Sequence, residues 1–186
     1  MAQRNKFPLV LKASTIIAAV AAAILALLYQ IYSLNWLLAS AISTVTTCYH
    51  FAMRLAVGYT IPHLVPLDAA KSRWFHQRAW EPKLYANLKV KQWKDHMPTY
   101  DPASFSLREN TLEQIVFNSC VSEAVHEVII LLSFVPLLFA LLWDAFPVFL
   151  ITSILAALFD SCFVIMQRYN RPRLMRILSK KEANGL

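Results

Sequence analysis

Three ionisable side chains lie deep inside apolar stretches of this sequence. They are His50, His126 and Asp160, and such groups are costly in an apolar environment and are usually functional. Glu123 precedes His126 by three residues, so the two side chains share one face of a helix. An imidazole beside a carboxylate is suited to accept a proton from a hydroxyl group. The sequence therefore predicts a candidate functional site around Glu123 and His126.

Two other interpretations of these residues stay open. In one, His126 pairs with Glu123 or Asp160 only to hold helices together. In the other, Glu123 and His126 are two ligands of a carboxylate-bridged metal site that His50 and Asp160 complete, because Glu-x-x-His gives two ligands from one helix. The first, catalytic interpretation needs neither a metal nor another cofactor.

A second candidate site follows the last apolar stretch, where arginines alternate with amides and a tyrosine. Guanidinium groups bind phosphates through forked hydrogen bonds that an ammonium group cannot form. We expect substrate to be bound by these polar residues, by a basic tryptophan patch and by two of the intramembrane groups: Gln167, Arg168, Tyr169, Asn170, Arg171, Arg173, Trp93, Lys94, His50 and Asp160. The alternative is a basic cluster that only contacts anionic lipid.

The composition identifies the environment in which these residues work. Hydrophobic residues make up 58% of the 186 residues and charged residues only 16%, and the mean hydropathy is +0.45. These values exclude a disordered chain and are abnormal for a soluble domain. The net charge of +7 lies in blocks beside apolar stretches, so we expect a membrane as partner and no nucleic acid.

Hydropathy predicts an all-α integral membrane protein with four transmembrane helices. Residues 13–53 form a run of 41 without a charge, and a spanning helix needs about 20. Polar turn residues near Asn35 and near Asp144 divide the two apolar halves of the chain. The predicted helices are 13–33, 36–56, 112–142 and 146–167, within a single membrane domain that comprises residues 1–186.

Basic residues predict the orientation of these helices. Three precede the first helix, 9 lie in the central region and 6 follow the last helix, whereas the two short turns have none. The positive-inside rule then places both termini in the cytoplasm, in a multi-pass protein of the cell membrane. The segment 57–111 is predicted to be amphipathic and to lie on the inner leaflet against anionic lipids, and 168–186 to form a basic tail.

Three segments carry distinctive motifs: QRYNRPRL at 167–174, WFHQRAWEPKLYANLKVKQWKD at 74–95, and LEQIVFNSCVSEAVHE at 112–127. Together they resemble the glycosyl-4,4'-diaponeurosporenoate acyltransferase family. The resemblance implies a small membrane enzyme that esterifies a sugar hydroxyl of a glycosylated carotenoid with a fatty acyl group. It implies a lipid or glycolipid acceptor and an activated acyl donor, with acyl-CoA as the expected co-substrate. It also implies that His126 is the base and that Glu123 orients it.

The predicted orientation can be tested with cysteine labelling. In a variant that lacks the native cysteines, a cysteine near Asn35 or Asp144 should react with an impermeant thiol reagent added outside intact cells, because both turns are predicted to be external. A cysteine at Lys91 should react only after the cells are opened. Labelling at Lys91 from outside would contradict the topology.

Overall fold

The computed structural model describes residues 7–140 and 146–184, and helices dominate this part of the chain. No strand occurs among these described residues, which confirms the predicted all-α class. The elements are α1 (Phe7–Tyr32), α2 (Asn35–Thr60), η1 (Ile61–His63), η2 (Ala69–Lys71), η3 (Arg73–Phe75), α3 (Glu81–Asn87), α4 (Val90–Trp93), η4 (Lys94–His96), η5 (Ala103–Phe105), α5 (Leu112–Leu132), α6 (Pro136–Phe139) and α7 (Phe146–Ala183).

The chain forms two compact units where the sequence predicts one domain. The first unit contains residues 1–59 and 128–159, and the second contains residues 60–127 and 160–186. The boundaries therefore fall at the end of α2, within α5 and within α7. Each unit is described by itself below, and the candidate site lies entirely in the second.

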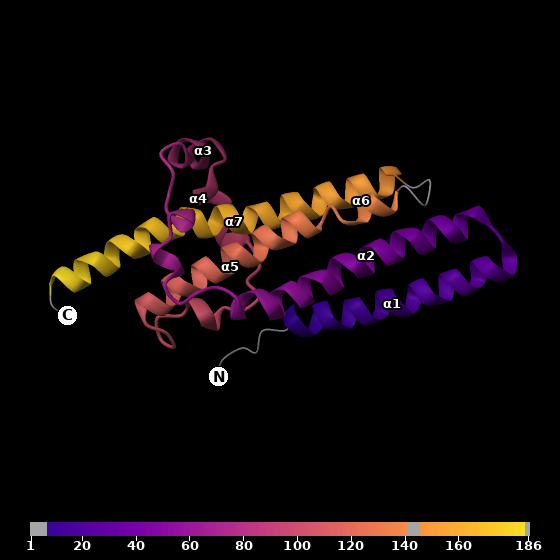
Figure 1. Cartoon of the computed structure of the whole chain (residues 1–186), viewed down its shortest axis with the longest axis horizontal. Coiled ribbons are helices and arrows are strands. Elements are labelled where there is room, and N and C mark those ends of the chain that lie inside the picture. Colours follow the sequence, from indigo (N-terminus) through magenta and orange to yellow (C-terminus); the bar gives the residue numbers. More distant parts are fainter. Residues whose placement is uncertain (1–6, 141–145, 185–186) are drawn as a thin grey trace. The chain divides into compact units, whose positions relative to one another are not determined.

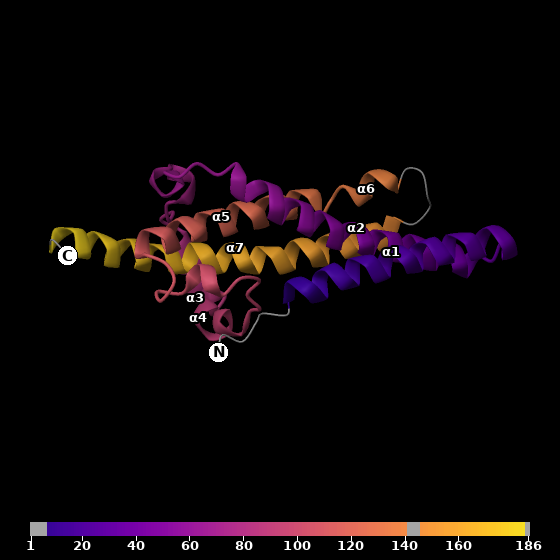
Figure 2. The same ribbon diagram turned by 90° about the horizontal axis from the view of Figure 1, so that it is seen from below.

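In the first unit, α1 and α2 form an antiparallel helical hairpin (Figure 1 and Figure 2). The turn between them is Ser33–Leu34, where it was predicted, and Ser33 adopts a positive φ of 52°. Its backbone N–H still donates to the carbonyl oxygen of Tyr29 at 2.8 Å, which closes the last turn of α1. Exposed apolar side chains cover much of α1, as a lipid-facing helix requires: Ile16, Ile17, Leu27 and Ile31 are all more than half exposed.

Among the described residues, three helices are long and apolar enough to cross a membrane. They are Pro8–Tyr32, Leu112–Phe139 and Phe146–Lys181. The remaining predicted span, 36–56, corresponds to α2, which has 26 residues and is thus about 39 Å long. This helix is more polar, but its hydroxyl groups bond back to its own backbone, as Thr46 does to the carbonyl oxygen of Ile42 at 2.8 Å. Its crossing of the membrane stays a prediction.

The third predicted helix, 112–142, is shorter in the structure. Helix α5 ends at Leu132, and the turn that follows is held by bonds between residues three apart, such as that from the Val135 N–H to the Leu132 carbonyl oxygen at 3.1 Å. Pro136 is the physical reason, because it has no N–H to donate to the carbonyl oxygen of Leu132 and its ring crowds that carbonyl. The predicted turn near Asp144 lies outside the described residues.

The fourth predicted helix, 146–167, is longer in the structure. Helix α7 has 38 residues and continues to Ala183 through the region that was expected to be a tail. Arg, Leu, Met and Lys, which all favour helices, are frequent there, and they outweigh the single hydrogen bond that Pro172 removes. The second half of α7 is therefore rigid enough to hold side chains in fixed positions.

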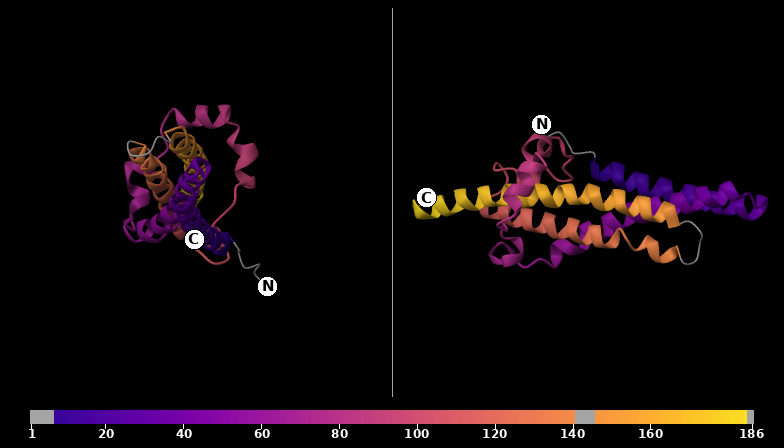
Figure 3. Two further views of the ribbon diagram at one scale, coloured as in Figure 1. Left: turned by 90° about the vertical axis from the view of Figure 1, so that its right-hand side faces the viewer. Right: turned by 90° about the horizontal axis from the view of Figure 1, so that it is seen from above.

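In the second unit, the central segment folds as short helices and turns. Prolines at positions 62, 66, 82, 98 and 102 interrupt it, and no helix in it is longer than the 7 residues of α3. Helices α3 and α4 pack beside the second half of α7, whose other neighbour is the first half of α5 (Figure 3). This arrangement brings residues from three distant segments together.

Candidate functional site

Four buried charges connect α3, α5 and α7 in the second unit. Arg168 of α7 lies between two carboxylates, 2.5 Å from Oε1 of Glu123 and 2.6 Å from Oε1 of Glu81. Arg171 faces the other oxygen of Glu123, with Nη2 and Oε2 2.6 Å apart. We call these two glutamates and two arginines the charge network. Their formal charges sum to zero, as burial of ionised groups requires.

Every N–H of the Arg168 guanidinium group has a protein acceptor. Nε donates to Glu81 at 2.9 Å, Nη1 to Glu123 and to the backbone carbonyl of Trp74, and Nη2 to Glu81 and to the backbone carbonyl of His76. A guanidinium group has five N–H donors, so none is left for another ligand.

Arg171 is held almost as completely. Its Nη1 donates to the backbone carbonyl of Phe75 at 3.0 Å, and its Nη2 donates to the carbonyl oxygen and hydroxyl group of Ser119. The guanidinium group also stacks over the Phe75 ring, 5.2 Å from its centroid. The residue is only 2% exposed. The guanidinium groups of Arg168 and Arg171 therefore bind mainly protein groups, and their predicted binding of substrate phosphates stays a prediction.

Sequence spacing explains how the network forms. Arg168 and Arg171 are three residues apart on α7 and therefore share a face. Glu123 lies about one turn after Ser119 on α5, so one face of that helix supplies the two α5 residues that bind Arg171. Glu81 begins α3, where Pro82 occupies an early helical position that needs no N–H donor.

Tyr85 completes the environment of Glu81. Its hydroxyl group donates to Oε2 of Glu81 at 2.8 Å, one helical turn away on α3. Burial, reinforced by this hydrogen bond and by the negative charge of Glu81, raises the pKa of the Tyr85 hydroxyl well above its usual range. The phenol therefore stays protonated and keeps donating at any physiological pH.

His126 lies in a separate cluster of the same unit. Its Nδ1 is 2.8 Å from Oδ1 of Asp160, and its ring stacks on Phe163 with centroids 4.4 Å apart and planes 5° apart. The Asp160 side chain is 1% exposed and the His126 side chain is 20% exposed. The imidazole is thus fixed on two sides and still reachable. Its carboxylate partner is Asp160 rather than the expected Glu123, which the two arginines occupy.

The other predicted site residues are distributed more widely. Gln167 is buried and its amide donates to the Ser122 hydroxyl at 3.2 Å, whereas Asn170 and Tyr169 are half-buried on α7 and Arg173 is exposed. Trp93 donates to the carbonyl oxygen of Leu88 at 2.9 Å, and Lys94 forms an ion pair with Asp95 at 2.6 Å. His50 is buried on α2 in the first unit.

Sequence reasoning missed Glu81 and the part played by Ser119. Charge balance could have indicated Glu81. Arg168 and Arg171 both face Glu123, and one carboxylate cannot balance two buried guanidinium groups, so a second carboxylate is required. Glu81 offers one within the WEPKLY stretch of the same family-like segment. No sequence pattern indicates the backbone carbonyls at Trp74, Phe75 and His76, because their direction depends on the turns around η3.

A shallow pocket lies beside the charge network. It measures about 180 Å³ and is lined by tryptophan rings and charged groups: Trp74, Arg78, Trp80, Glu81, Glu127 and Arg168. The Trp74 indole N–H donates to Glu127 at 2.8 Å. In the described part of the chain, no group of three or more His, Cys, Asp or Glu side chains is arranged to hold a metal ion.

Comparison with known proteins identifies one family. Residues 71–180 match the model of a family described as glycosyl-4,4'-diaponeurosporenoate acyltransferase. No curated protein and no solved structure matches the chain. The matched region contains the whole charge network, the pair of His126 and Asp160, and the pocket beside the network.

The charge network predicts a large loss of stability when one partner is removed. Arg168→Met should destabilise the protein by about 3–5 kcal/mol, because it leaves the buried carboxylate of Glu81 without a counter-charge and leaves Glu123 with Arg171 alone. Arg168→Lys should recover only part of this loss, since an ammonium group has three donors in place of five. Thermal unfolding in detergent micelles, followed by tryptophan fluorescence, measures the effect.

Arg173→Met is the matched control, because Arg173 is exposed on the same helix. It should change stability by no more than about 0.5 kcal/mol. Equal unfolding temperatures for the Arg168→Met and Arg173→Met variants would show that the network does not support the fold.

Proposed function

The chain belongs to the glycosyl-4,4'-diaponeurosporenoate acyltransferase family, whose model covers more than half of it, and from this premise we propose that it transfers a fatty acyl group to a hydroxyl group of a membrane glycolipid. Acyl transfer is the activity that the family name states. The hydrogen bond between His126 and Asp160 is the observation that carries the proposal to particular residues. The activated acyl donor is a thioester such as acyl-CoA, and no metal or other cofactor is required.

The geometry around His126 supports its role as general base. The Asp160 carboxylate, 2.8 Å away, accepts a hydrogen bond from the protonated Nδ1, and this tautomer leaves Nε2 as the basic atom of the ring. The stacked Phe163 ring fixes the plane of the imidazole, so Nε2 keeps one direction. Asp160 also stabilises the imidazolium that forms when Nε2 takes a proton. Asp160 therefore has the orienting role that the sequence assigned to Glu123.

The proposed reaction forms an ester bond to the acceptor and breaks the thioester bond of the donor, and it moves one proton from the acceptor hydroxyl group to the departing thiol. Nε2 of His126 takes the proton from the acceptor hydroxyl group while the oxygen of that hydroxyl group attacks the carbonyl carbon of the thioester. A tetrahedral oxyanion forms, and it collapses as the carbon–sulfur bond breaks. The departing thiolate takes the proton from the imidazolium, which returns His126 to its neutral form and leaves an ester and a free thiol.

The tryptophan-lined pocket beside the charge network supports an acceptor with a polar, ring-shaped headgroup. Indole faces stack on sugar rings, and the carboxylate of Glu127 and the guanidinium group of Arg78 offer hydrogen bonds to hydroxyl groups. Glu127 directly follows His126 on α5. The charge network fixes this pocket through Arg168, which holds the backbone of Trp74, and so acts as a positioning device rather than a binding site.

The proposal also includes the membrane setting. The three long apolar helices support an integral membrane protein, and α2 as a fourth span would return both termini to the cytoplasmic side of the cell membrane. The acceptor's lipid chains then stay in the bilayer while its headgroup and the donor meet at the cytoplasmic edge. Basic residues of the central segment and of α7, such as Arg173, would contact anionic lipids of the inner leaflet.

Substitution of the base tests the mechanism directly. His126→Gln should lower kcat about 100-fold to 10,000-fold, because an amide cannot accept the hydroxyl proton. Asp160→Asn should lower kcat as well, since an amide no longer holds the Nδ1 proton by charge. The measurement follows transfer of a labelled acyl group from a thioester to membrane lipid extracts by mass spectrometry.

Thermal unfolding of the same preparations separates chemistry from folding. Normal kcat in a folded His126→Gln protein would remove His126 from catalysis. Loss of stability in both variants without a change in kcat would mean that the pair only joins α5 to α7. Absence of acyl transfer by the wild-type protein with any lipid acceptor would favour a non-catalytic protein that binds lipids.

A further inference from the structure

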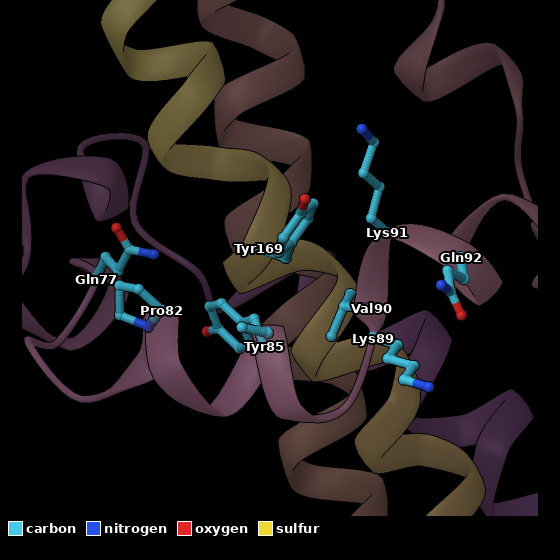
Figure 4. Close-up of a pocket in the computed structure, with 9 residues that line it drawn as sticks. Gln77, Pro82, Tyr85, Lys89, Val90, Lys91, Gln92 and Tyr169 are labelled. Carbon is cyan, nitrogen blue, oxygen red and sulfur yellow. The ribbon is translucent and has the colours of Figure 1, made fainter.

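A second pocket of the second unit is lined by neither His126 nor the two arginines of the charge network. It measures about 460 Å³, within the range of small-molecule sites, and opens between α3, α4 and α7 (Figure 4). Its lining contains two lysines, two glutamines and two tyrosines: Gln77, Tyr85, Lys89, Lys91, Gln92 and Tyr169. None of its lining residues is acidic, so its charge is positive.

The two lysines at this pocket are available to a ligand. Neither Lys89 nor Lys91 forms an ion pair with a carboxylate among the described residues, and both are exposed. Lys94, close by in sequence, pairs with Asp95 instead. Two ammonium groups without counter-charges at one opening favour an anionic ligand, and phosphate is the anion that such lysines bind most readily.

The backbone at Lys89 supports a binding role. Its φ is 51°, in the left-handed region that a lysine rarely adopts, and it connects α3 to α4. Backbone strain of this kind is found most often at functional sites. Here it turns the chain so that Lys89 and Lys91 line the same opening.

The tyrosines give the pocket a rigid aromatic wall. Tyr85 and Tyr169 pack edge to face with ring centroids 5.7 Å apart, and Figure 4 shows both rings beside the opening with Lys89 and Lys91 across from them. Tyr85 is fixed by its bond to Glu81 and therefore by the charge network. A flat ring can stack on Tyr169, and the amides of Gln77 and Gln92 can pair with its polar edges.

We propose that this pocket, which we call the donor pocket, binds the phosphate-bearing nucleotide part of the acyl donor. The inference rests on the proposed function and adds which residues hold the donor. Lys89 and Lys91 contact the phosphates, and Tyr169 stacks on the base. Lys89 and Lys91 thus take the phosphate-binding role that the sequence assigned to Arg168 and Arg171, whose guanidinium groups bind mainly protein acceptors.

Binding of coenzyme A to the purified full-length protein tests the proposal. Lys89→Asn keeps the left-handed backbone, because asparagine tolerates it, and Lys91→Gln removes the second charge. Each should raise the Kd for coenzyme A, and the donor KM, about tenfold while kcat changes little. The double variant Lys180→Gln/Lys181→Gln removes two exposed charges elsewhere and should leave both constants unchanged.

Other results would overturn the donor pocket. Equal coenzyme A affinity in wild type, Lys89→Asn and Lys91→Gln would do so, as would no binding at all. If vesicles that contain phosphatidylglycerol bind through Lys89 and Lys91 and displace coenzyme A, the pocket holds a lipid headgroup instead. Acyl transfer with an unchanged donor KM in both variants would end this inference and leave the proposed function intact. Coenzyme A binding that depends on Lys89 and Lys91, without any acyl transfer, would support the donor pocket and contradict the proposed function.

Discussion

Charge balance inside an apolar protein is the constraint on which the second unit depends. Glu123 is completely buried, and a carboxylate in that position is tolerated only with its counter-charges in contact. Arg168 and Arg171 supply them, and Arg168 in turn requires Glu81. Each of these ion pairs connects two segments of the chain, so the charge network joins α3, α5 and α7.

This constraint separates two tasks that the sequence had combined. Glu123 and His126 share a helix and look like one site, but the structure gives them different partners on α7. Arg168 and Arg171 hold α3, α5 and α7 together, while the imidazole remains partly exposed and forms a hydrogen bond with Asp160. A rigid support beside a reachable base is the arrangement that precise acyl transfer needs, because the base must meet the hydroxyl group within hydrogen-bond reach.

The positions of the long helices could be predicted well from the sequence. Helix α1, the turn after Tyr32, and the starts of α5 and α7 follow from hydropathy and from polar turn residues. It did not predict the end of α5 before Pro136 or the helical continuation of α7, because hydropathy reports burial in lipid rather than backbone geometry. His126 and Asp160 were singled out as rare intramembrane charges. Their pairing, and the pairing of Glu81 with Arg168, depends on how α3, α5 and α7 pack, which residue spacing alone does not determine.

The order in which the network's members occur along the chain has a consequence for biosynthesis. Glu123 precedes Arg168 by 45 residues and Glu81 precedes it by 87. A ribosome therefore delivers both carboxylates before either arginine exists. During that interval Glu123 has no counter-charge, and α5 gains little from a settled position in the bilayer. Only α7 brings the arginines that pair with Glu123, so the second unit can complete its charge balance only late in synthesis, once α7 has emerged.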